Sequence, residues 1–133
     1  MIDISLPITS LAAVINGTIL LALTYRVIVL RRRDGVVLGD NGDRVLTKAI
    51  RGQANAAEQM PIAIILLALA ELQGGQSTVL MILMLMLTLG RASHAIYFGV
   101  HGTHWRFRFY GMLLTLAAQA GLILTLLALV IIW

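Results

Sequence analysis

Four long uncharged stretches dominate the chain. Residues 5–25, 59–70, 72–90 and 109–133 contain no Asp, Glu, Lys or Arg, and most of their positions are apolar. With its flanks, each stretch supplies the roughly 20 apolar residues that a helix needs to cross about 30 Å of hydrocarbon. The pattern predicts a single domain, residues 1–133, with four membrane-spanning helices at about 6–32, 46–72, 77–98 and 105–132.

The segments between these stretches are short. Residues 34–44 are rich in Gly, Asp and Asn, which is typical of a turn-rich loop, and residues 73–77 form a tight turn. So short a turn makes the second and third helices antiparallel neighbours, and residues 99–103 connect the third and fourth. We therefore expect an all-α membrane protein built as a four-transmembrane-helix bundle.

The basic residues fix an expected orientation in the membrane. All ten Lys and Arg residues lie at the end of the first span, in the loop and helix start that follow it, or around the connection between the third and fourth spans. Cytoplasmic loops of membrane proteins carry such an excess of Lys and Arg. We expect both basic loops in the cytoplasm and both termini outside, with the first stretch retained as an uncleaved span.

Composition excludes several classes of protein. A chain that is 59% hydrophobic and 12% charged, with a mean hydropathy of +0.92, would aggregate as a soluble domain. The basic residues adjoin spans rather than forming a patch on a folded domain, which favours anionic lipids or an anionic ligand over nucleic acid. The chain contains no cysteine, so any reactive thiol must come from a ligand.

Candidate chemistry begins in the second predicted helix. Arg51, Asn55 and Glu58 stand at i, i+4 and i+7, so they share one face. A charge near the bilayer centre costs about 2.5 to 3.5 kcal/mol, so Glu58 must face protein or a water-filled cavity. Arg51 and Glu58 are about 10.5 Å apart along the helix axis, too far for an easy direct pair. Each therefore needs another partner, either a structural ion pair between helices or a ligand.

The third predicted helix carries Arg91, His94 and either Tyr97 or Phe98 on one face near its end. His94 is either a packed, hydrogen-bonded histidine or a ligand-binding group, and its position one turn from Arg91 leaves both readings open. His101 and His104 follow in the loop, but no carboxylate or cysteine accompanies them, so we expect no metal site.

The fourth predicted helix opens with a basic and aromatic cluster. Trp105 and Phe107 fit an interfacial aromatic belt. Arg108 is different, because Thr115 and Gln119 continue its face into the membrane as a polar stripe. Arg106 also lies at this end of the helix, so either arginine could face a ligand.

The ordered motifs resemble those of the MAPEG family, the membrane-associated proteins in eicosanoid and glutathione metabolism. Residues 49–61 carry an Arg, an Asn and a Glu before Pro61, at the spacing of the family's second helix. Arg-Ala-Ser-His at 91–94 and Arg-Phe-Tyr-Gly at 108–111 continue the match. Gly-Asp-Asn-Gly at 39–42 is similar to the cytoplasmic loop of small bacterial members. The residue after Glu58 is Gln59, where the family usually has an aromatic residue.

The resemblance implies a homotrimer with three glutathione sites between neighbouring subunits, open toward the cytoplasm. In the family pattern, Arg108 stabilises the thiolate, although the Arg-to-Gly spacing alone selects it over Arg106. The residues implied to bind glutathione are Arg51, Asn55, Glu58, Arg91, His94 and Tyr97. Separated arginines and one deep carboxylate complement the two carboxylates and the ammonium of the tripeptide.

Three functional hypotheses follow from these observations. The first is a glutathione-dependent transferase or peroxidase of the bacterial inner membrane, acting on a lipophilic electrophile. The second is a non-catalytic family member that binds glutathione, a lipid or another anion, or that serves as a structural partner. The third, a small multidrug exporter, conflicts with the first span, which carries no Asp or Glu after Asp3.

Overall fold

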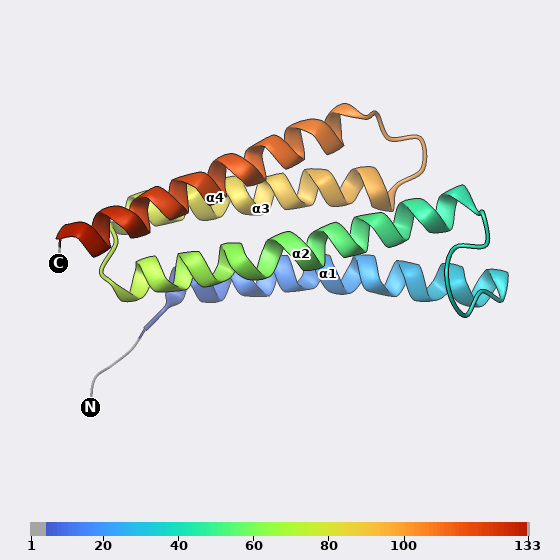
Figure 1. The fold of residues 1–133 in the computed structure, drawn as a ribbon, viewed down its shortest axis with the longest axis horizontal. Helices are drawn as coiled ribbons and strands as arrows, with labels where there is room; N and C mark the ends of the chain where they lie inside the picture. The colour runs from blue at the N-terminus through green and yellow to red at the C-terminus, as the bar shows by residue number, and fades with distance from the viewer. Residues whose placement is uncertain (1–4, 133) are drawn as a thin grey trace.

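The computed structural model describes residues 5–132, which form four antiparallel helices (Figure 1). The helices are α1 (Pro7–Asp34), α2 (Arg44–Leu72), α3 (Ser77–Gly99) and α4 (Arg106–Ile132). All four are long and apolar enough to cross a membrane. The prediction of an all-α bundle of four membrane helices is confirmed, and each helix end lies within two residues of its expected position.

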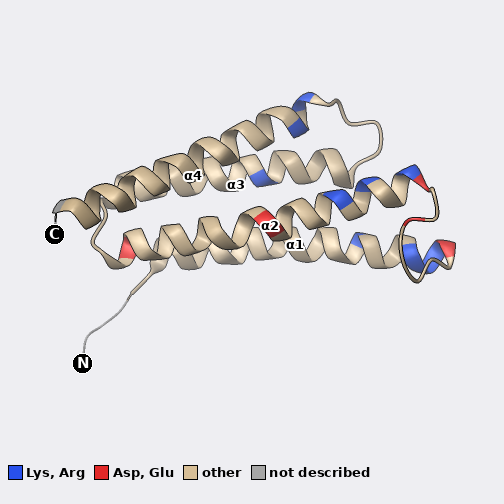
Figure 2. Cartoon of the chain, viewed as in Figure 1, with Lys and Arg blue, Asp and Glu red and all other residues tan. Residues whose placement is uncertain are grey.

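The bundle places its connections at opposite ends. The α1–α2 and α3–α4 connections lie together at one end, and the α2–α3 turn lies at the other end with the carboxyl terminus (Figure 1). Lys and Arg gather toward the end that carries the α1–α2 and α3–α4 connections (Figure 2). We call this the basic end of the bundle. Basic residues from separate parts of the sequence therefore lie at one end of the folded bundle, as the positive-inside pattern requires.

Local capping explains where α1 ends and α2 begins. Gly35 adopts a left-handed conformation with φ of 65°, and its N–H donates to the carbonyl of Arg31, which terminates α1. Asp43 caps α2 because its carboxylate accepts a hydrogen bond from the N–H of Val45 at 2.7 Å. Both caps lengthen the helices by two residues relative to the prediction from apolar periodicity alone.

The loop between α1 and α2 is tied down by Asp40. Its carboxylate accepts hydrogen bonds from the Thr47 hydroxyl at 2.7 Å and from the Gly42 N–H at 3.1 Å. These bonds, chiefly the one from Thr47, hold the pKa of Asp40 below its ordinary value. The loop is therefore fastened to the first turn of α2.

A single carboxylate joins α2 to α1 at the opposite end. Glu71 accepts hydrogen bonds from the N–H groups of Ile8 at 3.0 Å and Thr9 at 2.8 Å, and from the Thr9 hydroxyl at 2.7 Å. The first N–H groups of a helix have no partners within the helix, so Glu71 caps α1 from a neighbouring helix. This contact explains one of the two acidic residues in the spans without reference to a ligand.

The contact between α3 and α4 depends on small residues at the level of Arg91 and His94. A Cβ atom added at Gly90 would lie 2.8 Å from the carbonyl oxygen of Gly111, and one added at Gly111 would lie 2.7 Å from the backbone nitrogen of His94. Such small residues allow helix backbones to approach closely in membranes. The distance between α3 and α4, and hence between the side chains they present, is set here.

Candidate functional site

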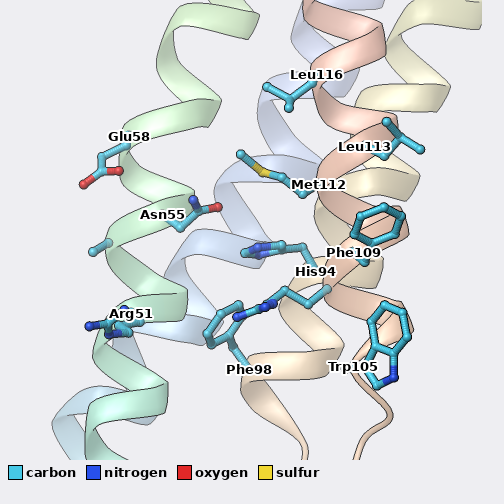
Figure 3. A pocket seen from close by; sticks show the side chains of 12 residues that line it. Arg51, Asn55, Glu58, His94, Phe98, Trp105, Phe109, Met112, Leu113 and Leu116 are labelled. Carbon is cyan, nitrogen blue, oxygen red and sulfur yellow. The ribbon is translucent and has the colours of Figure 1, made fainter.

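A cavity of about 710 Å³ lies among α2, α3 and the start of α4 (Figure 3). We call it the central cavity. It is lined by Arg51, Ala54, Asn55, Glu58, His94, Phe98, Trp105, Arg108, Phe109, Met112, Leu113 and Leu116. Its volume is within the range of small-molecule sites in proteins, and it combines an apolar wall with a few charged groups, which is typical of such sites.

The polar face predicted on α2 forms one wall of the cavity. Arg51, Asn55 and Glu58 all line it, as their spacing predicted. In Figure 3, Asn55 points across the cavity toward α3 and α4, whereas the Arg51 and Glu58 side chains leave the same face of α2 directed away from α4. Arg51 and Glu58 are exposed in the single chain. Within residues 5–132, neither forms a hydrogen bond or an ion pair through its side chain.

Arg91 lies behind this wall and does not line the cavity. Its side chain is 1% exposed and donates hydrogen bonds to Asn55 Oδ1 at 2.9 Å, Thr115 Oγ1 at 2.8 Å and Met112 Sδ at 3.4 Å. The guanidinium thus holds α2, α3 and α4 together. By engaging the oxygen of Asn55 it also orients that amide, whose nitrogen remains available as a donor.

His94 and Tyr97 have different positions although they share a helix. His94 is buried and lines the cavity, with its ring centroid 4.8 Å from that of Phe98. Tyr97 does not line it. The Tyr97 ring instead lies near two cations, with Lys48 Nζ 4.1 Å and Arg108 Cζ 5.7 Å from its centroid. Tyr97 is therefore placed to position Arg108 through a cation–π contact.

The structure distinguishes the two arginines at the start of α4. Arg108 lines the central cavity, whereas Arg106, about 200° around the helix, lines none of the described cavities. Within the described residues the Arg108 guanidinium has no carboxylate within ion-pair distance. The polar stripe expected below Arg108 turns into the bundle, because Thr115 binds Arg91 and the Gln119 amide donates to the carbonyl of Gln59 at 3.0 Å.

The apolar wall opposite α2 was not predicted from the sequence. Trp105, Phe109, Met112 and Leu116 recur at helical spacing and line the cavity, and in Figure 3 Met112 and Leu116 point from α4 toward α2. Their spacing alone could have indicated a common face, but on a uniformly apolar helix it does not distinguish a cavity wall from a lipid-facing surface. Trp105, interpreted as an interfacial residue, lines the cavity.

The charges and the apolar wall together define what the cavity can bind. Arg51 and Arg108 offer two separated cations, and Glu58 offers one carboxylate, with none of the three neutralised by the described residues. No group of three or more His, Cys, Asp or Glu residues in the described part of the chain could hold a metal ion. The cavity suits an organic ligand with both anionic and cationic groups, beside an apolar second molecule.

Comparison with known proteins identifies related sequences over most of the chain. The model of the MAPEG family matches residues 9–128. The chain is 34% identical over 117 residues to "Inner membrane protein YecN" of Escherichia coli K12 and to the protein of the same name in Escherichia coli O6:H1, covering 88% of each chain. No solved structure matches significantly.

Proposed function

The chain belongs to the MAPEG family, and from this premise we propose that it is a glutathione-dependent membrane transferase or peroxidase acting on lipophilic electrophiles. Family membership makes it a membrane protein of the group concerned with glutathione and eicosanoid metabolism. The specific activity is our inference from the central cavity.

The observation that carries the proposal is the set of unpaired charges around the cavity. Glutathione has two carboxylates, one ammonium and a thiol that can ionise, and Arg51 complements a carboxylate, Glu58 the ammonium and Arg108 the thiolate. Each of these charges costs free energy in a membrane unless it finds a partner or water. A zwitterionic tripeptide supplies those partners, and the Asn55 amide nitrogen, oriented by Arg91, adds a hydrogen-bond donor.

The apolar wall offers a binding surface for the lipophilic electrophile of the proposed reaction. Bound glutathione supplies the thiol that attacks the electrophile. Arg108 stabilises the negative charge on sulfur, since a neighbouring cation favours the thiolate. Phe109, Met112, Leu113 and Leu116 form an apolar surface next to it, where a molecule partitioning from the bilayer would lie.

We also propose that the site is completed by a second copy of the chain, in a homotrimer. Arg51 and Glu58 line the cavity from the exposed flank of α2, so the cavity is open along this edge in one subunit. An exposed Glu58 facing hydrocarbon would be costly. Packing of a neighbouring subunit along this edge removes that cost and gives three equivalent sites per trimer.

The protein is an integral membrane protein, and we propose that it lies in a bacterial inner membrane with its basic end in the cytoplasm. The two YecN proteins are named as inner membrane proteins, and the gathering of Lys and Arg at one end follows the positive-inside pattern. In this orientation the central cavity opens toward the compartment that contains glutathione.

Labelling of single cysteines tests this orientation. The chain has no cysteine of its own, so each variant reports one site. Val37→Cys in the α1–α2 loop, where Val37 is 95% exposed, and His101→Cys in the α3–α4 connection should resist a membrane-impermeant maleimide added to intact cells. Gln76→Cys, in the opposite turn, should react. Labelling of either basic-end cysteine from outside would reverse the topology.

A conjugation assay tests the proposed activity. Purified protein with glutathione and a chlorodinitrobenzene should form the thioether faster than the uncatalysed mixture, in proportion to protein concentration. Glu58→Gln should raise the KM for glutathione about tenfold or more, because a hydrogen bond to a charged group is worth roughly 1.5–3 kcal/mol.

Asp34→Asn provides the matched control for Glu58→Gln. It makes the same carboxylate-to-amide change at an exposed site outside the cavity, where Asp34 pairs with Arg33, and should leave KM unchanged. If Glu58→Gln weakens glutathione binding but the unmodified protein turns over none of several electrophiles, the result would favour the non-catalytic binding protein. An equal effect of both variants would remove Glu58 from the site.

A further inference from the structure

A second cavity, of about 340 Å³, lies at the basic end of the bundle. We call it the basic pocket. Arg26 of α1 and Arg44 and Lys48 of α2 line it, together with His101 and Thr103 of the α3–α4 connection. No carboxylate lines the pocket, and within residues 5–132 none of the three cations forms an ion pair. Because like charges repel, an anion bound here would stabilise the folded chain.

An apolar groove of about 300 Å³ adjoins this pocket along the α1–α3 interface. Arg26 and Val100 line both cavities, so the groove leads to the basic pocket. The groove is lined on α1 by Ile19, Ala22 and Leu23, and on α3 by Ala92, Ala95, Ile96 and Gly99. The positions on each helix follow the i, i+3, i+4 spacing of a single face, and the small residues among them leave room for a narrow apolar chain.

The depth of Arg26 matches the boundary between hydrocarbon and headgroups. Helix α1 has 28 residues and is therefore about 42 Å long, against about 30 Å of hydrocarbon. About 12 Å of helix must extend beyond the apolar layer, and the basic residues near Asp34 belong to that extension. Arg26 lies eight residues before Asp34, at the base of the extension.

Arg26 also has an unused donor at this boundary. Its Nε atom is buried and has no hydrogen-bond partner among the described residues. A buried donor without a partner costs about 1–3 kcal/mol, so a small turn of this side chain that let Nε donate to a phosphate in the basic pocket would offset that cost. The unpartnered Arg26 Nε and the absence of carboxylates in the basic pocket are two separate observations that both favour a bound anion.

We propose that the basic pocket and the groove together bind one anionic phospholipid. Its phosphate lies against Arg26, Arg44 and Lys48, and one acyl chain follows the groove between α1 and α3. A free phosphate would leave the groove without an occupant, and an uncharged lipid would leave the three cations without an anion. An anionic phospholipid matches both cavities with one molecule.

Lipid retention measured by native mass spectrometry tests the headgroup contacts. Protein released from phosphatidylcholine bilayers that contain a minor fraction of phosphatidylglycerol should retain phosphatidylglycerol preferentially. Arg26→Gln and Lys48→Gln should each lower that retention about fivefold, the effect of one basic residue near an anionic lipid. Arg32→Gln removes an exposed charge on α1 outside both cavities and should have little effect. Equal losses in all three variants would overturn the site.

Filling the groove tests the acyl-chain contact. Ala92→Leu should lower retention of phosphatidylglycerol, whereas Ala120→Leu, the same change at an exposed position of α4 outside the groove, should not. Circular dichroism checks that every variant is folded. Displacement of the lipid by excess inorganic phosphate would assign the pocket to a free phosphate instead. A change in subunit number caused by Ala92→Leu would assign the groove to a second copy of the chain, and either result overturns the proposal.

Discussion

Replacing Arg108 with alanine should lower turnover at neutral pH about tenfold to a hundredfold while leaving the oligomer assembled. Arg108 lines the central cavity and has no carboxylate partner among the described residues. A cation near a thiol favours its charged form, and such a neighbour changes a pKa by roughly 1–3 units. Its removal should raise the pKa of the bound glutathione thiol, so the thiolate fraction near neutral pH falls.

The pH dependence separates this role from simple loss of binding. A raised thiol pKa means that the missing thiolate reappears as pH increases, so turnover of the Arg108→Ala variant should partly recover in alkaline solution. Affinity for glutathione should fall only modestly, because Arg51 and Glu58 remain. Ultraviolet absorbance of the bound thiolate, titrated against pH, measures the effect directly.

Arg106→Ala is the matched control for this prediction. Arg106 is two residues away on the same helix but lines none of the described cavities, so thiolate absorbance should be nearly unchanged. Loss of the thiolate in the Arg106 variant with retention in the Arg108 variant would reverse the assignment. Absence of any thiolate in the unmodified protein would favour the non-catalytic alternative.

The spans were predictable because membrane insertion imposes a simple rule on sequence. A helix must present about 20 apolar residues to hydrocarbon, and the four uncharged stretches satisfy this without reference to tertiary contacts. The helix ends were harder to predict from the sequence. The cap that Asp43 gives α2 involves one side chain and one N–H, and apolar periodicity does not contain it. The hydrogen bonds from the start of α1 to Glu71 were not predictable either, because they span sequence separations of 63 and 62 residues.

The polar face of α2 was predictable for a different reason. Arg51, Asn55 and Glu58 belong to one helix, so their spacing alone places them together. The role of Arg91 was not predictable in this way, since its partners Asn55 and Thr115 are 36 and 24 residues away. A sequence pattern therefore cannot distinguish an arginine that lines a cavity from one that supports its wall.

The close approach of α3 and α4 leads to the second large effect that we predict. Gly111→Ala should destabilise the protein by about 1–3 kcal/mol, the usual cost of overpacking a well-packed contact. The added Cβ would lie 2.7 Å from the backbone nitrogen of His94 and 2.8 Å from the carbonyl oxygen of Gly90. These are backbone atoms, which cannot rotate away, so the two helices must separate.

Separation at Gly111 should also impair the site. Gly111 lies three residues after Arg108 and contacts the backbone of His94, so both cavity groups would move relative to each other. We expect a lower thermal unfolding temperature in detergent together with a reduced kcat/KM for glutathione conjugation. A misplacement of about 1 Å can cost on the order of a hundredfold in rate.

Gly17→Ala and Gly121→Ala are the controls that make this prediction specific. A Cβ at Gly17 meets nothing within 4 Å, so alanine there should be neutral or slightly stabilising, since it favours the helix over glycine. The nearest neighbour of a Cβ at Gly121 is the Leu83 side chain, whose terminal methyl groups can rotate, so the loss should be smaller than at Gly111. If all three variants unfold at the same temperature, the α3–α4 contact does not set the geometry of the site. If only Gly111→Ala loses both stability and turnover, the glycine contact and the distance between His94 and Arg108 depend on the same backbone approach.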